Sequence, residues 1–218
     1  MSSTIGPDEE AATGDASPGR SATATVLFLC TGNICRSRMA EAILVDRAAR
    51  RRLPLRAASA GLLEGGLTPP PEVATVLEEL RVPCDRLTRP GRTMRRRDLD
   101  TASLVLGLAR EHVRAAAVLR PEVWPRAFTL KELVRRGRDL GPRSRDEPLE
   151  GWVARAHAGR QPEDLLGRST DDDVEDPFGL PLSRYRRTGQ EIAHAVDELV
   201  ELLWPLRPEE RCGAGGAA

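Results

Sequence analysis

The 218-residue chain lacks three features that would each point to a class of protein: an excess of one charge, a long apolar run, and a dense set of cysteines. Thirty-three basic residues balance thirty-three acidic ones, so no basic field favours nucleic acid as a partner. No apolar stretch approaches the roughly 18 residues of a membrane span, so we expect no membrane partner either. Residues 1–24 are small, polar and acidic, without the apolar middle of a signal peptide. These absences predict a cytoplasmic protein.

Lysine is almost missing as well, because Lys131 is the only one among 33 lysines and arginines. Clusters of arginine therefore carry little information here, and we interpret residues 95–97 as a solvated face. The four cysteines are too few for the disulfide framework of a small secreted protein. Thiol chemistry in a reducing compartment is the better interpretation of Cys30, Cys35, Cys84 and Cys212.

What is present is an alternation of short apolar runs and amphipathic stretches between residues 24 and 206. Such alternation is typical of β-α-β architecture with a parallel sheet, and the length suits one domain. We predict an α/β fold: a single three-layer domain with a central four-stranded parallel sheet flanked by helices. The expected strands are 26–29, 55–59, 103–108 and 126–129, and the expected helices are 37–52, 69–80, 110–119, 130–136, 149–158 and 182–203.

Three segments depart from this pattern. Residues 1–23 and 207–218 are poor in apolar side chains, so we expect a disordered N-terminal tail and a flexible C-terminal tail. The stretch at about 137–175 is polar, charged and punctuated by glycine and proline. We interpret it as an insertion in the domain at 24–206, made of filler or a loosely packed helix.

The densest chemical signal lies between the first predicted strand and the first predicted helix, in Cys30-Thr31-Gly32-Asn33-Ile34-Cys35-Arg36-Ser37. A loop in this position points successive backbone N–H groups at one centre, and the helix N-terminus adds positive potential. Gly32 and Asn33 tolerate the left-handed backbone that such a turn needs. Arg36, six positions after Cys30, can hold two oxygens of one phosphate. We predict a phosphate-binding loop in which Cys30 is a nucleophilic thiolate and Ser37 donates to it.

Transfer of a phosphoryl group to sulfur also needs a proton donor for the leaving group. We interpret the three histidines, His112, His157 and His194, as structural or exposed. Asp176, in Asp176-Pro177-Phe178-Gly179, is the better candidate, because the proline fixes the backbone that follows it. Phe178 could then form a wall for an aromatic substrate.

At this point the residues resemble the low-molecular-weight protein tyrosine phosphatase family, within the arsenate reductase-like superfamily. The segments that carry the resemblance are Val26 to Ser37, Met39-Ala40-Glu41-Ala42, Ser59-Ala60-Gly61, Leu104-Val105-Leu106 and Asp176-Pro177-Phe178-Gly179. They span about residues 24 to 206.

The resemblance implies that Cys30 attacks phosphorus and forms a phosphocysteine, while Arg36 and the amides of residues 31–36 bind the transferring group. Asp176 would protonate the leaving oxygen and then activate water. Asn33, Ser37 and Ser59 would form a supporting hydrogen-bond network. Cys35 would be a redox partner that bonds reversibly to Cys30 under oxidation. Neither a cofactor nor a metal is implied, and the expected substrate is a phosphorylated protein or a small phosphomonoester.

Other activities remain open on the same loop. In protein arginine phosphatases the resemblance associates the position of Ile34 with threonine, so isoleucine favours phosphotyrosine. A thiol-dependent arsenate reductase needs resolving cysteines downstream, for which Cys84 is a single candidate. A phosphate-binding or redox module without turnover is a further alternative, since residues 62–66 lack the aromatic wall usual in the family. We expect a monomer or a weak dimer.

Overall fold

The computed structural model describes residues 23–166 and 171–206. The predicted tails at 1–23 and 207–218 lie outside these residues, apart from Thr23. Within the described ranges, no helix combines the length and apolar character needed to cross a bilayer.

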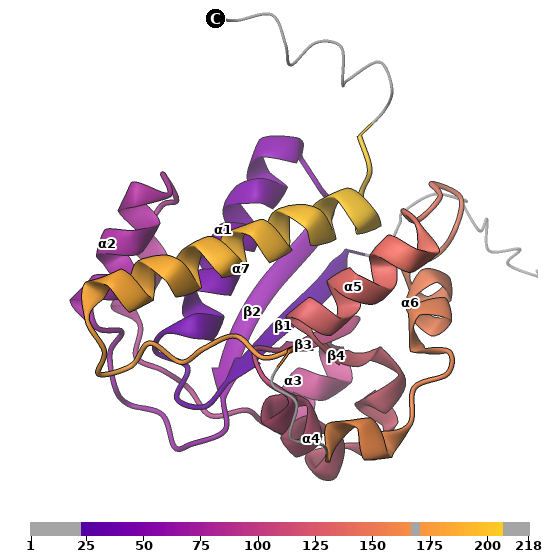
Figure 1. The fold of residues 1–218 in the computed structure, drawn as a ribbon, viewed down its shortest axis with the longest axis horizontal. Coiled ribbons are helices and arrows are strands. Elements are labelled where there is room, and N and C mark those ends of the chain that lie inside the picture. Colours follow the sequence, from indigo (N-terminus) through magenta and orange to yellow (C-terminus); the bar gives the residue numbers. More distant parts are fainter. Residues whose placement is uncertain (1–22, 167–170, 207–218) are drawn as a thin grey trace, which may run out of the picture.

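The centre of the fold is a sheet of four parallel strands (Figure 1), as the sequence predicted. Its strands are β1 (Ala24–Cys30), β2 (Leu55–Gly61), β3 (Leu104–Gly107) and β4 (Ala127–Thr129), in the order β2-β1-β3-β4. The chain first moves from β1 to one side and later returns to the other side. The loop after β1 therefore lies where the strand order reverses, which is where open α/β sheets bind ligands.

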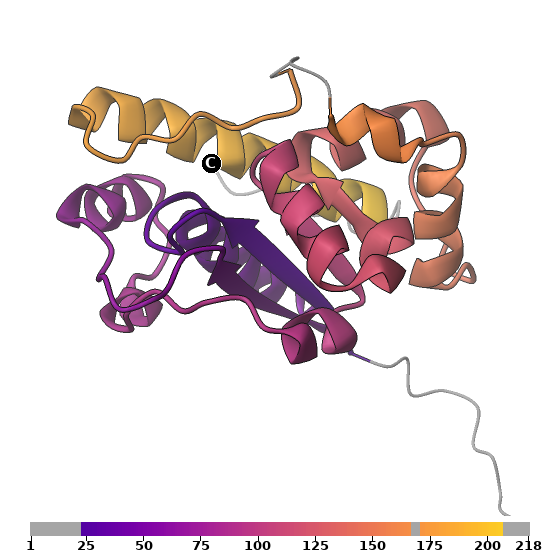
Figure 2. The ribbon, with the colours of Figure 1, turned by 90° about the horizontal axis from the view of Figure 1, so that it is seen from below.

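Helices cover both faces of the sheet and complete the three layers (Figure 2). One face, which carries Phe28, packs against α1 (Arg36–Arg51), α2 (Pro71–Glu79), α5 (Leu130–Leu140), α6 (Leu149–His157) and α7 (Leu182–Leu203). The other face, which carries Leu29, packs against α3 (Arg96–Thr101) and α4 (Arg110–Leu119). Successive residues of β1 point to opposite faces, and residues 26–30 are all buried, which explains the continuous apolar run in its sequence.

The expected insertion is packed, so its interpretation as filler or a loose helix is wrong for α6. Trp152 of this helix is completely buried, and its Nε1–H donates to the Gly141 carbonyl at 3.0 Å. Val153 and Ala156 are buried beside it. Figure 1 shows α6 at one end of the molecule, beside α5 and far from the start of α7.

Arg160, just after α6, anchors this region to the core. Its guanidinium lies 3.9 Å from the centre of the Trp124 ring and 4.0 Å from that of Phe128. Its Nε and Nη2 donate to the two carboxylate oxygens of Glu132 at 2.7 and 3.1 Å. Paired charge and two aromatic faces let an arginine remain buried here, which the scarcity of apolar residues in the segment concealed.

Candidate active site

The loop after β1 forms a tight turn around the Cys30 thiol. The Asn33 amide donates to Cys30 Sγ at 3.2 Å, and Asn33 adopts a left-handed backbone with φ of 55°. Gly32 was expected to do the same, but it is not among the described residues with positive φ. One left-handed residue is thus enough to turn the chain back on the sulfur.

A neighbouring strand end packs closely against this turn. A Cβ atom on Gly61 would lie 2.9 Å from the Asn33 nitrogen and the Thr31 oxygen. Gly61 is the register partner of Cys30 across β1 and β2, so sheet pairing brings these two backbones together. The glycine is required here by space rather than by its φ angle.

A buried chain of hydrogen bonds leads from the loop to a carboxylate on α1. Glu41 accepts a hydrogen bond from the Ser59 hydroxyl at 2.6 Å. Because its hydroxyl proton is used, Ser59 Oγ accepts from Asn33 Nδ2 at 2.8 Å, and the second Nδ2 proton goes to Ser37 Oγ at 2.9 Å. The Ser37 hydroxyl proton is left for Cys30 Sγ, 3.0 Å away. The order of donors therefore makes Ser37 a donor to the thiol, and it adds Glu41 to the network that the sequence predicted.

Arg36 extends from the first turn of α1 to the segment before α7. Its Nη2 donates to Asp176 Oδ2 at 2.5 Å, and its Nη1 donates to the Val174 carbonyl at 3.2 Å. Arg36 is 4% exposed, whereas the Asp176 side chain is 44% exposed. The structure thus brings together Cys30, Arg36 and Asp176, which lie up to 146 positions apart in the sequence. Arg36 Nε is buried and has no hydrogen-bond partner among the described residues.

Two residues of α4 also reach the loop. His112 is completely buried, and its Nε2 lies 3.1 Å from Thr31 Oγ1. Glu111 Oε1 lies 3.4 Å from the same hydroxyl. Burial and, to a smaller extent, the Arg36 charge lower the pKa of His112 from 6.5 to about 3, so the imidazole is neutral. Nothing in the sequence indicated this contact, because His112 looked like an ordinary helix residue.

The second loop cysteine is buried and protonated. Burial and, next, the Asp176 charge raise the pKa of Cys35 from 9.0 to about 12. Tyr185 of α7 hydrogen-bonds to Cys35, and burial raises the pKa of that tyrosine to about 12 as well. Cys84 is half-buried, and its thiol donates to the Val82 carbonyl at 3.6 Å. Burial raises the pKa of Cys84 too.

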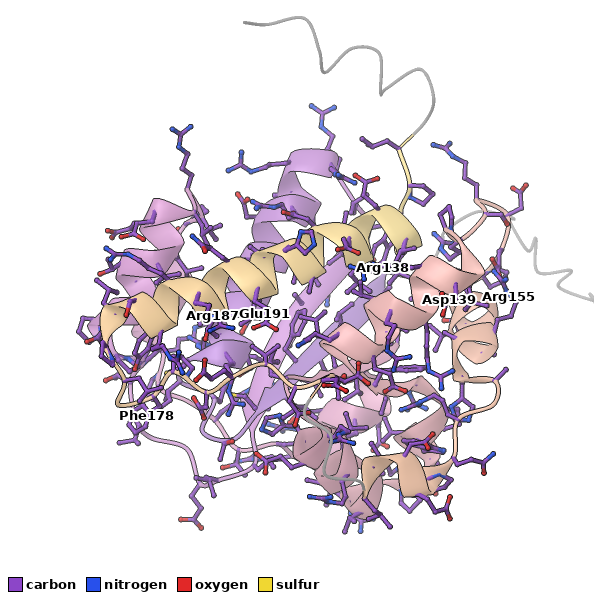
Figure 3. The ribbon with its side chains drawn as sticks, in the orientation of Figure 1. Arg138, Asp139, Arg155, Phe178, Arg187 and Glu191 are labelled. Atoms are coloured by element: carbon purple, nitrogen blue, oxygen red, sulfur yellow. The ribbon has the colours of Figure 1, made fainter. Side chains whose placement is uncertain are left out.

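Two segments next to the active-site residues carry exposed apolar side chains. Leu63, whose amide donates to the Thr31 carbonyl at 3.0 Å, is 59% exposed. Phe178, whose amide donates to Asp176 Oδ1 at 3.2 Å, is 57% exposed, and Figure 3 shows it at the edge of the molecule. Ile34 is buried in the loop itself. A leucine therefore lies on the side where the sequence showed no aromatic wall.

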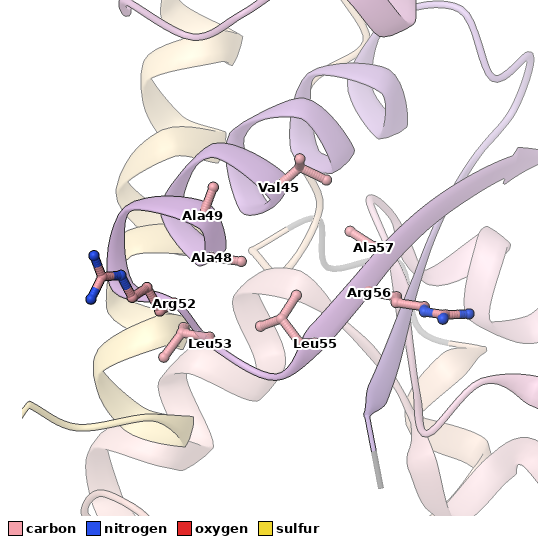
Figure 4. Close-up of a pocket in the computed structure, with 8 residues that line it drawn as sticks. All are labelled: Val45, Ala48, Ala49, Arg52, Leu53, Leu55, Arg56 and Ala57. Carbon is pink, nitrogen blue, oxygen red and sulfur yellow. The ribbon is translucent and has the colours of Figure 1, made fainter.

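A separate hollow of about 580 Å³ lies between α1 and the edge strand β2 (Figure 4). Its lining includes Val45, Ala48, Leu53 and Leu55, and no residue of the Cys30 loop. We therefore place the chemistry at the loop and not in this hollow.

Comparison with known proteins agrees with this geometry. The family model for low molecular weight phosphotyrosine protein phosphatase matches residues 25–148. A protein-arginine-phosphatase of Geobacillus stearothermophilus is 27% identical over 180 residues, which cover 82% of this chain and 95% of the relative.

Two solved structures are also similar. The low molecular weight protein tyrosine phosphatase from T. tengcongensis has a TM-score of 0.62 and 31% identity, over 83% of this chain and 99% of that one. A YwlE arginine phosphatase, a cysteine-to-serine mutant with a phosphorylated active site serine, has a TM-score of 0.60 and 25% identity, over 81% of this chain and 93% of that one. The family match covers more than half of the sequence, and it confirms the resemblance seen in the motifs. The chain belongs to the low molecular weight phosphotyrosine protein phosphatase family.

Proposed function

We propose that the protein hydrolyses phosphotyrosine-type phosphomonoesters through a phosphocysteine on Cys30. The thiolate attacks phosphorus, the bond to the leaving oxygen breaks, and Asp176 gives that oxygen a proton. Water then attacks the phosphocysteine, Asp176 takes the proton from the water, and Cys30 leaves as a thiolate with release of inorganic phosphate. The observation that carries the proposal is the convergence of Cys30, Arg36 and Asp176 at one strand end.

Charge stabilisation comes from the loop and from Arg36. The transferring phosphoryl group bears negative charge on its equatorial oxygens, so catalysis depends on donors that are already in place. The amides of residues 31–36 lie at the start of α1, and Arg36 Nε is a buried donor without a described partner. An unsatisfied guanidinium N–H is costly in a protein interior, and a phosphate oxygen would satisfy it.

Binding of a phosphate would change the charges that surround Asp176. Its carboxylate pairs with Arg36 Nη2 in the structure. A bound phosphate dianion would attract the Arg36 donors and place a negative charge beside the carboxylate. Both changes would loosen the pair of Asp176 with Arg36, which leaves the carboxyl group available to the leaving oxygen.

Several side chains favour phosphotyrosine as the substrate. The exposed side chains of Phe178 and Leu63 lie on segments whose backbones bond to Asp176 and to the Cys30 loop, so they could pack against an aromatic ring. The family pattern also associates isoleucine, here Ile34, with phosphotyrosine. A protein arginine phosphatase is the second candidate, because a relative of that name aligns over 82% of the chain. Glu111, whose carboxylate lies 3.4 Å from Thr31 Oγ1, could accept N–H groups from a phosphorylated guanidine.

Cys35 is suited to protect the nucleophile against peroxide. A peroxide converts the Cys30 thiolate to a sulfenic acid, and the Cys35 thiol then condenses with it to give a disulfide and water. A buried, protonated Cys35 does not compete for phosphate as a second thiolate. This cycle suits a reducing compartment such as the cytoplasm, where the disulfide is reduced again.

Turnover of p-nitrophenyl phosphate in the presence of EDTA tests the nucleophile. We expect Cys30→Ser to lower kcat by at least about 10⁴-fold, because a serine hydroxyl is a poor nucleophile without an adjacent base. Cys84→Ser is the matched control and should keep full activity. Unchanged turnover in Cys30→Ser would overturn the assignment.

The substrate class is tested by parallel assays with a phosphotyrosine peptide, a phosphoarginine peptide, and arsenate with a thiol reductant. We expect the phosphotyrosine peptide to have the highest kcat/KM. A higher value for phosphoarginine would establish the second candidate instead. No turnover with any of them, together with measurable phosphate binding, would leave a binding module.

A further inference from the structure

We propose that His112 is a positioning residue that holds Arg36 in place through the Thr31 hydroxyl. The inference rests on the proposed function, in which Arg36 binds the phosphoryl group. Arg36 Nη2 donates to Thr31 Oγ1 at 3.1 Å, and His112 Nε2 lies 3.1 Å from the same oxygen. One hydroxyl thus joins the guanidinium to a buried imidazole.

The sheet register explains how a residue 81 positions away reaches the loop. Leu29 of β1 is paired with Gly107 of β3, and the Leu108 amide donates to the Leu29 carbonyl at 2.9 Å. Helix α4 begins two residues later, and its first turn carries His112 over the start of the loop. The contact is therefore fixed by the pairing of two central strands and does not depend on a mobile connection.

The charge state of His112 suits this task. Its ring is neutral at physiological pH, since burial and the neighbouring Arg36 both oppose a second cation. A neutral imidazole can hold the hydroxyl without attracting a phosphate dianion to itself. A lysine or a charged histidine at this position would compete with Arg36 for the substrate.

Without His112, carboxylates would compete for the same groups. Glu111 Oε1 lies 3.4 Å from Thr31 Oγ1, and Asp176 Oδ2 lies 2.5 Å from Arg36 Nη2. Without the imidazole, the Thr31 hydroxyl would be held only by its long hydrogen bond to Glu111, and its oxygen could rotate away from Arg36 Nη2. That nitrogen would then keep only its carboxylate partner. The imidazole thus limits how far Arg36 is drawn to Asp176, and it leaves the guanidinium available to phosphate.

A purely structural role would be served better by an apolar side chain. His112 Nδ1 is buried and has no hydrogen-bond partner among the described residues. A leucine would fill similar space without an unsatisfied polar atom, and such an atom is costly to bury. A histidine at this position is explained if Nε2, which contacts Thr31, has a function that outweighs the cost of burying Nδ1.

The test is binding of inorganic phosphate to the full-length protein, measured by calorimetry, together with its inhibition constant in the p-nitrophenyl phosphate assay. We expect His112→Leu and Thr31→Val each to weaken phosphate binding about tenfold, the loss of roughly one hydrogen bond. The double variant should also lose about tenfold, because both substitutions remove the same link. His112→Gln should recover part of the affinity.

Val113→Ala is the control, since it removes methyl groups from a buried neighbour on α4 and should lower the melting temperature without changing phosphate affinity. Phosphate affinity within twofold of wild type in His112→Leu would overturn the proposal. Additive losses of about a hundredfold in the double variant would overturn it too. Because calorimetry measures phosphate binding without turnover, failure of the proposed phosphatase activity would be distinguished from failure of the proposed role of His112.

Discussion

Two of the buried arginines, Arg36 at 4% exposure and Arg160 at 6%, have different surroundings. Arg160 forms a two-point pair with Glu132 and lies between the rings of Trp124 and Phe128. Its charge is thus matched and enclosed. This arrangement stabilises the fold around α6.

Arg36 has a more exposed carboxylate partner than Arg160. Among the described residues its carboxylate partner is Asp176, whose side chain is 44% exposed. Its other acceptors are the Val174 carbonyl and the Thr31 hydroxyl, and its Nε has no hydrogen-bond partner among those residues. A buried arginine with unused donors is costly unless an anion binds it. The comparison separates an arginine that serves the fold from one that serves a ligand.

The largest effect should come from Arg36→Lys. We expect kcat/KM for p-nitrophenyl phosphate to fall about 10³-fold, because an ammonium cannot replace a planar fork of donors in the transition state. The melting temperature should change little. Loss of stability without loss of activity would show that Arg36 is structural like Arg160.

Arg160→Met should show the reverse pattern. We expect the free energy of unfolding to fall by about 3 kcal/mol, because Glu132 loses its two-point partner. Urea denaturation measures this loss, and kcat/KM at low temperature should remain within threefold of wild type. Adding Glu132→Leu to Arg160→Met should restore part of the stability, since it removes the carboxylate left without that partner. A large loss of activity in folded protein would contradict the assignment.

Asp176→Asn tests the exposed partner of Arg36. We expect kcat to fall about 10²-fold for a phenyl phosphate with a poor leaving group, because that oxygen needs a proton in the transition state. The loss should be much smaller for p-nitrophenyl phosphate. Equal losses across a series of leaving groups would exclude Asp176 as the general acid, and Asp173→Asn offers a control on the same segment.

Each arginine also has a histidine neighbour. The smallest expected effect is the contribution of these histidines to the pH dependence of stability. The folded pKa of His112 is about 3, below its ordinary 6.5, so only the unfolded chain binds this proton between those values. Stability should therefore fall as pH falls from 6.5 towards 3, by up to about 1.4 kcal/mol per pH unit from this group.

Urea denaturation of wild type and His112→Leu at several pH values measures this contribution. As the pH falls from 6.5 towards 3, wild type should lose stability relative to His112→Leu, so the difference between the two curves should change with pH. His157→Leu, next to Arg160, should change the slope less, although burial lowers the pKa of His157 as well. Parallel curves for wild type and His112→Leu would contradict a buried neutral imidazole.

The parts of the fold predicted from sequence are those encoded locally. The helix at 182–203 and the helix at 110–119 were predicted with the bounds that the structure has, because their apolar spacing is visible within a few turns. Helix α3 was missed, since its arginines made the segment look like solvated surface. The predicted exposure of residues 95–97 nevertheless agrees with the structure.

The sequence allowed a prediction only for the active-site residues that lie within the Cys30 loop and the other short motifs. Cys30 and Arg36 are six positions apart, so one turn brings them together. The contacts of His112 with Thr31, and of Arg160 with Glu132, depend on how distant segments pack. Polar residues in those segments had no periodic pattern to reveal them, so their burial could be known only from the fold.

The close contact at Gly61 also provides a way to switch the protein off without touching its reactive groups. An alanine there would act as a wedge, since its methyl carbon would meet three backbone atoms of the loop at 2.9 Å. The loop would have to shift, while Cys30, Arg36 and Asp176 all remained in the sequence. A Gly61→Ala protein would thus keep its nucleophile but have a distorted phosphate-binding loop, whereas Cys30→Ser keeps the loop and loses the nucleophile. Comparing it with Cys30→Ser would separate what phosphate recognition contributes from what sulfur contributes.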